Sequence, residues 1–398
     1  MAEPIVLDRE FIQDPYSLYR KLREEAPVRQ VVTPNGLRSW LVTRFEDARE
    51  ALADPRLSRD LRLAPDLFAR HSTTGRDAAE FGQELAAHML NSDPPDHTRL
   101  RRVVTRAFTM RRVEQLRPRI EQITADLLAG MAGRDEVDLL DAFAFPLPVT
   151  VMCELLGVPV EDQGEFRHWT HAMITSGDRD AAMAAIRDSA VYLSALIAGK
   201  RDNPADDLLS ALVHDEDETL NDVELISMAF LLLIAGHETT VNLIANGMLA
   251  LLRHPDQLAA LRADPGLVPG AVEEFLRYES PINNTPLRHT IAPVTIGGVE
   301  IPKGELVLVA LGSANRDTTR FPAADHLDIT REPTPHLAFG HGIHYCLGAP
   351  LARLEGQIAI ARLLEAFPAL ALATDPANLN WRNSNILHGL ESLPVRLR

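Results

Sequence analysis

The stretch Phe339-Gly-His-Gly-Ile-His-Tyr-Cys-Leu-Gly348 surrounds one of the two cysteines of this 398-residue chain. Its three glycines leave the backbone around Cys346 without side chains, so a large flat ligand has room to approach the sulfur. Pro350 follows closely and marks the first turn of a predicted helix. Cys346 therefore precedes a helix N-terminus, where free amides and the helix dipole favour the thiolate, the form of cysteine that binds metals.

Three other interpretations of this stretch stay open on the residues alone. The glycines could form a phosphate cradle, although no Gly-x-x-x-x-Gly-Lys-Ser/Thr pattern is present. His341, His344 and Cys346 could bind zinc, although no fourth ligand with a typical spacing stands nearby. An inert buried residue is the default for a lone cysteine. The glycines and the helix start favour a thiolate ligand over that default.

The chain is acidic and poor in cysteine. It has 40 Lys and Arg against 56 Asp and Glu, and this net charge of −16 opposes binding to nucleic acid. Two cysteines, Cys153 and Cys346, give no disulfide framework, which fits a reducing compartment. The N-terminus lacks a signal-peptide pattern, and the longest apolar run, Leu225 to Gly236, is shorter than the roughly 20 residues that span a bilayer. We expect a cytoplasmic protein that binds neither nucleic acid nor membrane.

Helical periodicity dominates the remaining sequence. Leu7 to Glu25 is predicted to form a short helix that leads into a hairpin. Apolar residues recur at three- and four-residue spacing in Val113 to Met131, Asp180 to Lys200, Val223 to Leu252 and Gln357 to Phe367. Two small β regions interrupt this pattern, a hairpin at 28–43 around Pro34-Asn35-Gly36 and a second region at 294–310. With 46% hydrophobic residues and no linker or repeat, the pattern predicts one mainly α domain over residues 1–398.

The predicted helix from Val223 contains Ala235-Gly-His-Glu-Thr-Thr240, a polar group inside an apolar run. Asn221 and Glu224 form a plausible capping box at its start. The His-Glu pair resembles part of a zinc-protease motif, but position 241, where that motif has its second histidine, is Val. Burying polar side chains here would be costly without a purpose. Gly236 would leave room for a planar ligand, and the Thr239 hydroxyl could bond the carbonyl of residue 235.

The chain resembles the cytochromes P-450 on two motifs that lie far apart in it. Phe339, Gly342, Cys346 and Gly348 fill the fixed positions of that family's Phe-x-x-Gly-x-x-x-Cys-x-Gly signature. The segment 235–240 matches its Ala-Gly-x-Glu/Asp-Thr-Thr signature. The resemblance implies the P-450 fold, a large helical domain with a small β-rich lobe. It also implies haem b (iron protoporphyrin IX), bound through the Cys346 thiolate.

The same resemblance implies roles for further residues. Glu238 and Thr239 would relay protons during oxygen activation, and the Glu274–Arg277 pair would be structural, with His326 offering the third partner that is often Arg in the family. His97 and Arg101, in a His-Thr-x-x-Arg motif, would bind the haem propionates together with Arg288 and His344. The expected haem contacts are Ala235, Gly236, Phe339, Gly340 and Gly348.

An arginine cluster follows the propionate motif. Arg102, Arg106, Arg111 and Arg112 stand out in so acidic a chain, and we expect them to dock an acidic ferredoxin by electrostatic steering. No Gly-x-Gly-x-x-Gly fingerprint for a flavin or nicotinamide is present, so we expect no fused reductase. Electrons would arrive from NAD(P)H through a separate ferredoxin reductase and the ferredoxin.

The expected activity is insertion of one oxygen atom from O2 into a sizeable apolar small molecule, by hydroxylation or epoxidation. Wording of several motifs resembles enzymes that act on macrolides, steroids or vitamin D. By resemblance, the pocket walls come from 61–90, 166–180 and 231–240 and from two later dipeptides, and include Leu90, Ile234, Leu287, Ile386 and Leu387. A peroxide-driven peroxygenase and a catalytically silent haem-thiolate recruiter or sensor are the alternatives.

Overall fold

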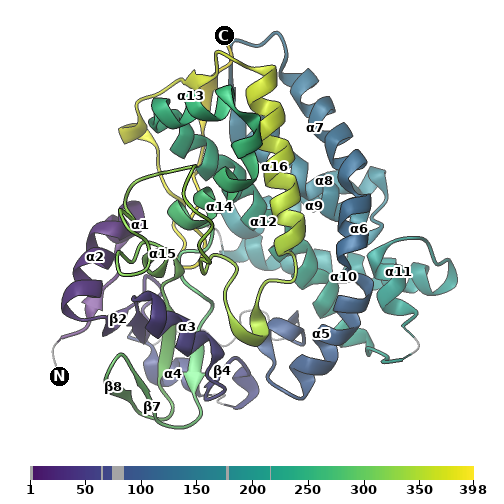
Figure 1. Cartoon of the computed structure of the whole chain (residues 1–398). Coiled ribbons are helices and arrows are strands. Elements are labelled where there is room, and N and C mark those ends of the chain that lie inside the picture. The colour runs from purple at the N-terminus through teal and green to yellow at the C-terminus, as the bar shows by residue number, and fades with distance from the viewer. Residues whose placement is uncertain (1–2, 64–65, 74–84, 176–178, 216) are drawn as a thin grey trace. The chain divides into compact units, whose positions relative to one another are not determined.

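Helices make up most of the structure, as the hydrophobic periodicity predicts (Figure 1). The computed structural model describes residues 3–63, 66–73, 85–175, 179–215 and 217–398. Backbone contacts divide the chain into two compact units. Unit 1 comprises Met1–Phe81, Asn242–Ala349 and Ala371–Leu393, and unit 2 comprises Gly82–Val241, Pro350–Leu370 and Pro394–Arg398. Helix α12 (Asp222–Arg253) contributes residues to both.

Unit 1 combines a β-sheet with short helices. Its helices are α1 (Arg9–Gln13), α2 (Pro15–Glu25), α3 (Phe45–Ala53), α4 (Leu67–His71), α13 (Pro255–Ala263), α14 (Val268–Tyr278) and α15 (Leu311–Ala314). Its strands are β1 (Ile5–Val6), β2 (Val28–Val32), β3 (Arg38–Val42), β4 (Leu57–Ser58), β6 (Arg288–Thr290), β7 (Val294–Ile296), β8 (Val299–Ile301), β9 (Leu306–Val309) and β10 (Ala371–Leu372). Six of these strands form one sheet within the described residues, in the order β1-β2-β3-β9-β6-β4, and β7 pairs with β8.

Alternation of side chains along the strands builds the core of unit 1 on both faces of the sheet. Val307 and Val309 of β9 join a buried cluster that includes residues of α3, whereas Leu308 between them joins a cluster with α1 and α2. Because successive strand residues point to opposite faces, an unbroken apolar run such as Leu306–Val309 requires cover on both. The sheet therefore holds in place the segment just before Arg288 in β6 and the segment just after Val309 in β9.

Unit 2 is almost entirely helical. Its helices are α5 (Asp96–Ala107), α6 (Met110–Gln115), α7 (Arg117–Met131), α8 (Pro146–Leu156), α9 (Gln163–Thr175), α10 (Arg179–Asp202), α11 (Leu208–Val213) and, after its first residue, α16 (Ala349–Ala366). Strands β5 (Glu136–Asp138) and β11 (Pro394–Arg396) pair antiparallel. The buried residues of α8, among them Val149, Met152 and Leu156, show why this apolar helix lies inside the unit.

The predicted elements are confirmed, with two helices divided. The hairpin at 28–43 forms as β2 and β3 in antiparallel register, and the 294–310 region forms β7, β8 and β9. The predicted helix at 7–25 is two helices, because Asp14 leaves the helical conformation (φ −140°, ψ 83°) and Pro15 starts the next helix. The predicted helix at 113–131 lies in α6 and α7, which meet just before Pro118.

Two helices pass a test for membrane spans by length and composition alone. They are Asp180–Asp202 and Asp222–Arg253, and the most apolar window of the second is 61% buried. A helix inside the core of a globular protein passes the same test when it packs against protein on most sides. The apolarity of α12 is therefore accounted for by its packing.

Candidate active site

The cysteine loop of unit 1 is closed by its own backbone. The Cys346 amide donates to the Phe339 carbonyl at 2.9 Å, and the Tyr345 amide donates to the Gly342 carbonyl at 3.0 Å. Gly340 and Gly342 both have positive φ, 72° and 74°, a region that side-chain-bearing residues rarely adopt. These bonds and conformations fix the loop from 339 to 346 before any ligand is considered.

A side chain at Gly342 and one at Gly348 would meet different neighbours. A Cβ on Gly342 would lie 2.9 Å from the Leu52 carbonyl oxygen at the end of α3, so this glycine allows close backbone packing. A Cβ on Gly348 would lie 3.9 Å from the Cys346 sulfur, an ordinary contact distance. The expectation that all three glycines make room for a flat ligand is therefore too simple. Gly342 makes room for α3.

Cys346 has an exposed thiol, whereas Cys153 is buried. It stands three residues before the start of α16, as predicted. The interpretation as an inert buried cysteine therefore fits Cys153 and not Cys346. Within the described ranges, no group of three or more His, Cys, Asp or Glu side chains could hold a metal ion, so the zinc alternative gains no support.

Arg288 and His344 belong to the same unit as Cys346. Arg288 is buried in β6, which pairs with β9, and its guanidinium donates to the Leu57 carbonyl at 3.2 Å. His344 ends a 3-10 turn, Gly342–His344, two residues before the cysteine. Their placement gives unit 1 a buried guanidinium and an imidazole to offer a negatively charged ligand.

Helix α12 carries the acid and the alcohol in unit 2. The Thr239 hydroxyl donates to the Ala235 carbonyl at 3.1 Å, which confirms the predicted bond one turn back. Glu238 is buried, while Ala235 is exposed on this otherwise apolar helix. At the helix start, the Glu224 amide donates to Asn221 Oδ1 at 2.9 Å and the Asn221 amide to Glu224 Oε2 at 3.0 Å, which confirms the capping box.

The neighbour of the acid is held separately. His237 is fully buried, and its Nδ1 lies 2.6 Å from the Leu233 carbonyl oxygen. A carbonyl only accepts, so Nδ1 carries the proton of that bond. His237 Nε2 lies 4.0 Å from Glu238 Oε2, beyond hydrogen-bond length, and Phe145 packs edge-on against the imidazole. His237 is thereby oriented by the helix backbone.

Gly236 lies against a side chain of α8. A Cβ at this position would lie 2.6 Å from the Met152 sulfur of α8. The space that the glycine provides is therefore filled by a side chain of the same unit, on the side where a Cβ would point. We assign the close approach of α8 to Gly236, and its contact with a planar ligand stays a prediction.

His97 and Arg101 lie four residues apart on α5, and therefore on one face of it. His97 is buried and Arg101 is partly exposed. This arrangement gives unit 2 a pair of cationic or hydrogen-bond-donating side chains on one face of a single helix. Their binding of the haem propionates stays a prediction.

Three of the four arginines in the predicted cluster on α5 and α6 form ion pairs with acids of unit 2. Arg102 contacts Glu218 at 2.6 Å, and Arg106 contacts Asp215 at 2.6 Å. Arg112 contacts Asp206 at 3.1 Å. These are partly exposed ion pairs, which contribute little stability each but cancel part of the positive field. The cluster is therefore less electropositive than its sequence indicates.

The predicted structural pair forms a buried network in unit 1. Arg277 donates to both oxygens of Glu274 at 2.7 Å. The third side chain is Arg331, whose Nε lies 3.2 Å from Glu274 Oε2. His326, which the sequence indicated, contributes only its backbone carbonyl, 3.2 Å from Arg277. The arginine that this position often uses is present, five residues later than expected.

The predicted pocket residues fall in both units. Leu90, in the 3-10 turn Met89–Asn91, and Ile234 belong to unit 2, whereas Leu287, Ile386 and Leu387 belong to unit 1. Residues 64–65, 74–84 and 176–178 of the predicted walls lie outside the described residues. Within unit 1, the Asn283 amide donates to the Ile386 carbonyl at 2.7 Å, and Ile282 forms an isolated antiparallel β-bridge with Leu387.

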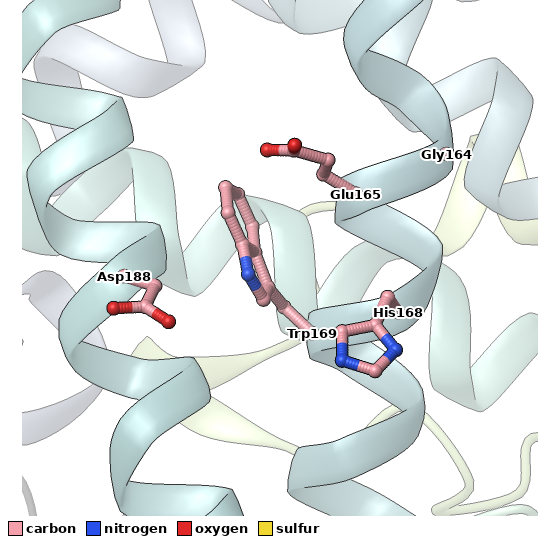
Figure 2. A pocket seen from close by; sticks show the side chains of 5 residues that line it. All are labelled: Gly164, Glu165, His168, Trp169 and Asp188. Atoms are coloured by element: carbon pink, nitrogen blue, oxygen red, sulfur yellow. The ribbon is translucent and has the colours of Figure 1, made fainter.

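A surface hollow of about 460 Å³ lies elsewhere, between α9 and α10 (Figure 2). Its lining is Gly164, Glu165, His168, Trp169 and Asp188, and the figure shows the indole between the two carboxylates. His168 and Trp169 fall in the predicted wall 166–180, but none of the individually predicted site residues lines this hollow. We assign it no role in catalysis.

A buried polar cluster in unit 1 has no counterpart in the sequence analysis. Glu279 accepts hydrogen bonds from Tyr16 at 2.8 Å and from Arg316 at 3.0 Å, and lies 3.0 Å from His388 Nε2. Burial alone would raise the pKa of Glu279, but Arg316, His388 and Tyr16 outweigh it and hold the pKa at about 2. Its members come from four separate segments, so no local motif could have revealed it.

The chain matches the family model described as Cytochrome P450 over residues 184–265 and 266–387. It is 55% identical to Cytochrome P450 107B1 of Saccharopolyspora erythraea, over 98% of this chain and 97% of that protein. It is 49% identical to the vitamin D(3) 25-hydroxylase of Pseudonocardia autotrophica, over 97% and 94%. The tirandamycin C-bound monooxygenase TamI superposes with a TM-score of 0.92 at 51% identity, over 99% of this chain and 100% of that one.

These matches agree with the site geometry. An exposed thiol before a helix, in a loop fixed by its own backbone, suits an iron ligand, and the matched family uses a haem-thiolate cofactor. The predicted fold class is confirmed by the structural match. The chain therefore belongs to the cytochrome P450 family and is a monooxygenase, an oxidoreductase that incorporates one oxygen atom from O2.

Proposed function

We propose that the chain binds haem b with the Cys346 thiolate as the axial ligand of iron. The observation that carries this proposal is the exposed Cys346 sulfur at the end of a backbone-closed loop, three residues before α16. When bound, a thiolate-ligated haem supplies iron-based cleavage of the O–O bond. The expected contacts of the macrocycle are Ala235, Gly236, Phe339, Gly340 and Gly348.

The propionates would be held by two sets of donors. His97 and Arg101 offer theirs from one face of α5, and Arg288 and His344 offer theirs from unit 1. Charge-assisted bonds between guanidinium and carboxylate are among the strongest in proteins, and Arg can make two at once. Their part is to orient the haem and to neutralise its carboxylates.

Glu238 and Thr239 would manage protons on the oxygen side. The Thr239 hydroxyl hydrogen is engaged with the Ala235 carbonyl, so the Thr239 oxygen keeps its lone pairs as acceptors. Glu238 is a buried carboxyl that can hold a proton at its Oε atoms and release it one residue away from that hydroxyl. Proton transfer by a positioned carboxyl contributes about 10²–10⁴-fold to a rate.

The substrate would be a sizeable apolar organic molecule that undergoes hydroxylation or epoxidation. Leu90, Ile234, Leu287, Ile386 and Leu387 offer apolar side chains for its pocket, as small-molecule sites usually require. Macrolide-, steroid- and vitamin D-like compounds fit this description. The relative named as a vitamin D(3) hydroxylase and the structure bound to tirandamycin C support compounds of this size.

Electrons would come one at a time from NAD(P)H through a ferredoxin reductase and a ferredoxin. Arg102, Arg106, Arg111 and Arg112 would meet the acidic ferredoxin, in competition with their own ion pairs. We further propose that residues 1–398 act as one P450 domain in the cytoplasm.

The ferrous–CO spectrum tests the ligand. The wild-type protein should absorb at the wavelength from which the family takes its number, and Cys346→Ala should lose that band. Cys153→Ala is the matched control, since it removes the buried cysteine, and should keep the band. Persistence of the band in Cys346→Ala would show that another group ligates iron.

Turnover then tests the activity and the substrate class. Vitamin D3 and tirandamycin C are suitable first compounds, and a low- to high-spin shift of the haem spectrum reports binding of either. Product should form with ferredoxin, reductase, NAD(P)H and O2. A protein that forms product only with peroxide is a peroxygenase, and one that forms none with either system, for any compound that shifts the spectrum, is a binding protein.

A further inference from the structure

The chain from Trp381 to Leu390, here called the C-terminal turn, is a hairpin-like element of unit 1. Trp381 bridges Leu390, and the Arg382 amide donates to the Gly389 carbonyl at 2.9 Å. At its tip, the Leu387 amide donates to the Ser384 hydroxyl at 3.0 Å. The tip presents two partly buried apolar side chains, Ile386 and Leu387.

His388 stands where this turn enters the buried polar cluster. It is 4% exposed, its Nε2 lies 3.0 Å from Glu279 Oε2, and its ring stacks on Trp381 with centroids 3.8 Å apart. Glu279 is ionised at neutral pH and only accepts, so His388 Nε2 is the donor. A donor on a buried carboxylate is held firmly, because leaving that charge with one partner fewer is costly.

The backbone of the same residues is held from two more sides. The His388 amide donates to the Pro281 carbonyl at 2.8 Å, next to the bridge between Ile282 and Leu387. The Asn246 side chain of α12 donates to the His388 carbonyl at 2.8 Å. His388 is thus bonded through its side chain, its amide and its carbonyl, directly after the two apolar residues at the tip.

We propose that His388 is a positioning residue for substrate: its bond to Glu279 holds Ile386 and Leu387 in one place, and this fixed wall selects among apolar substrates by size. The inference rests on the proposed function insofar as Ile386 and Leu387 line the pocket. His388 itself touches no reacting atom. Loss of its bond should therefore change binding of bulky ligands and leave the iron unaffected.

Two nitrogen ligands of haem iron can test this on the haem-loaded full chain. Imidazole is small, and dodecylimidazole adds a long apolar chain that reaches the pocket wall; both are titrated through the shift of the haem absorption band. His388→Phe keeps a ring to stack on Trp381 and loses the donor. We expect the dissociation constant of dodecylimidazole to rise at least about fivefold and that of imidazole to stay within about twofold.

Three further variants separate the explanations. Tyr16→Phe removes another bond to the same Glu279 oxygen from α2, outside the turn, and should leave both ligands unchanged. His388→Gln restores a donor and should recover part of the affinity. Ile386→Ala should weaken dodecylimidazole directly. The ferrous–CO band should persist in all four variants.

The outcomes are distinct. If Ile386→Ala leaves dodecylimidazole binding unchanged, the pocket assignment of these residues fails and this inference fails with it. If Ile386→Ala weakens binding but His388→Phe does not, only the role of His388 is wrong. If Tyr16→Phe acts like His388→Phe, the cluster stabilises the fold without positioning the turn, and the proposal is overturned.

Discussion

Two glycines, one in the cysteine loop and one in the α12 motif, serve different structural purposes. Gly342, in the cysteine loop, has φ 74° and faces the Leu52 backbone. Gly236, in α12, is helical and faces the Met152 side chain. A backbone neighbour is fixed by its own hydrogen bonds, whereas a methionine side chain can adopt other rotamers. The cysteine loop therefore depends on a backbone conformation that glycine adopts readily, whereas the α12 segment could adapt to a Cβ at Gly236 and depends on its polar side chains.

The largest effect should come from substituting Glu238 in α12. Glu238→Gln keeps the shape of the side chain and removes the exchangeable carboxyl proton, so O2-dependent product formation from a compound that the wild-type protein oxidises should fall by about 100-fold or more. The ferrous–CO band should stay, because the cysteine loop is untouched. Product is measured by chromatography under equal reduction rates.

Peroxide provides the control for this variant. Hydrogen peroxide brings its own protons with the oxidant, so peroxide-supported product formation should drop far less. Thr239→Ser, which keeps a hydroxyl able to bond the Ala235 carbonyl, should retain most activity. Equal losses with both oxidants would mean that Glu238 supports the fold or the substrate and delivers no proton.

The next largest effect should come from substituting glycines of the cysteine loop. Gly342→Ala combines a left-handed backbone with a Cβ placed 2.9 Å from a carbonyl oxygen, and should cost about 3 kcal/mol of unfolding free energy. Gly340→Ala has φ 72° but no atom closer than 3.9 Å, so it should cost about 1 kcal/mol. Denaturant titration and haem content measure both.

Gly236→Ala is the matched substitution in α12. Its Cβ meets the Met152 sulfur at 2.6 Å, but the methionine can move, and alanine favours a helix. The net cost should stay within about 1 kcal/mol. A larger loss for Gly236→Ala than for Gly342→Ala would contradict the distinction between the two regions.

The sequence allowed most of the local structure to be predicted. Helix periods, the hairpin at 28–43, the capping box at Asn221 and the Thr239 bond are all set by residues close together in the chain. Such features depend on local geometry, which sequence spacing encodes directly. The break at Asp14 also has a local cause, in Pro15, although periodicity alone did not indicate it.

Features made by distant segments could not be predicted. Arg331 reaches Glu274 across 57 residues, and the cluster around Glu279 joins four segments. The acids that pair with Arg102 and Arg106 lie more than 100 residues further along the chain. Spacing carries no information about such partners, which is why the arginine cluster seemed to be a bare positive surface.

Glu355 offers a third test, because it is a buried carboxyl in α16, the helix that follows the cysteine loop. Neither of its oxygens has a hydrogen-bond partner among the described residues, and burial raises its pKa to about 8. Unfolding therefore releases a proton between about pH 4.5 and 8, and stability should fall as pH rises through this range. Glu355→Gln should lack this loss, so its stability relative to wild type should increase as pH rises.

Melting temperatures from pH 5 to 8 measure the difference between Glu355→Gln and wild type, which should grow with pH. Glu365→Gln, at the exposed end of the same helix, is the control and should follow the wild-type slope. A constant offset between Glu355→Gln and wild type would mean that Glu355 stays ionised in the folded protein. In that case, burial of a carboxyl in an apolar helix would be weaker evidence that Glu238 has a catalytic role.

The smallest effect concerns the ion-paired arginines. Arg102→Gln with Arg106→Gln removes two cations whose field Glu218 and Asp215 already reduce, so reduction by an acidic ferredoxin should slow only about two- to threefold at low salt and not at all at high salt. Stopped-flow reduction measures this. Neutralising the acids instead, with Asp215→Asn and Glu218→Gln, frees the arginines and should speed the low-salt reaction. If neither pair of substitutions alters the rate at low salt, the ferredoxin docks elsewhere, and this face uses its charges only to join α5 to the segment before α12.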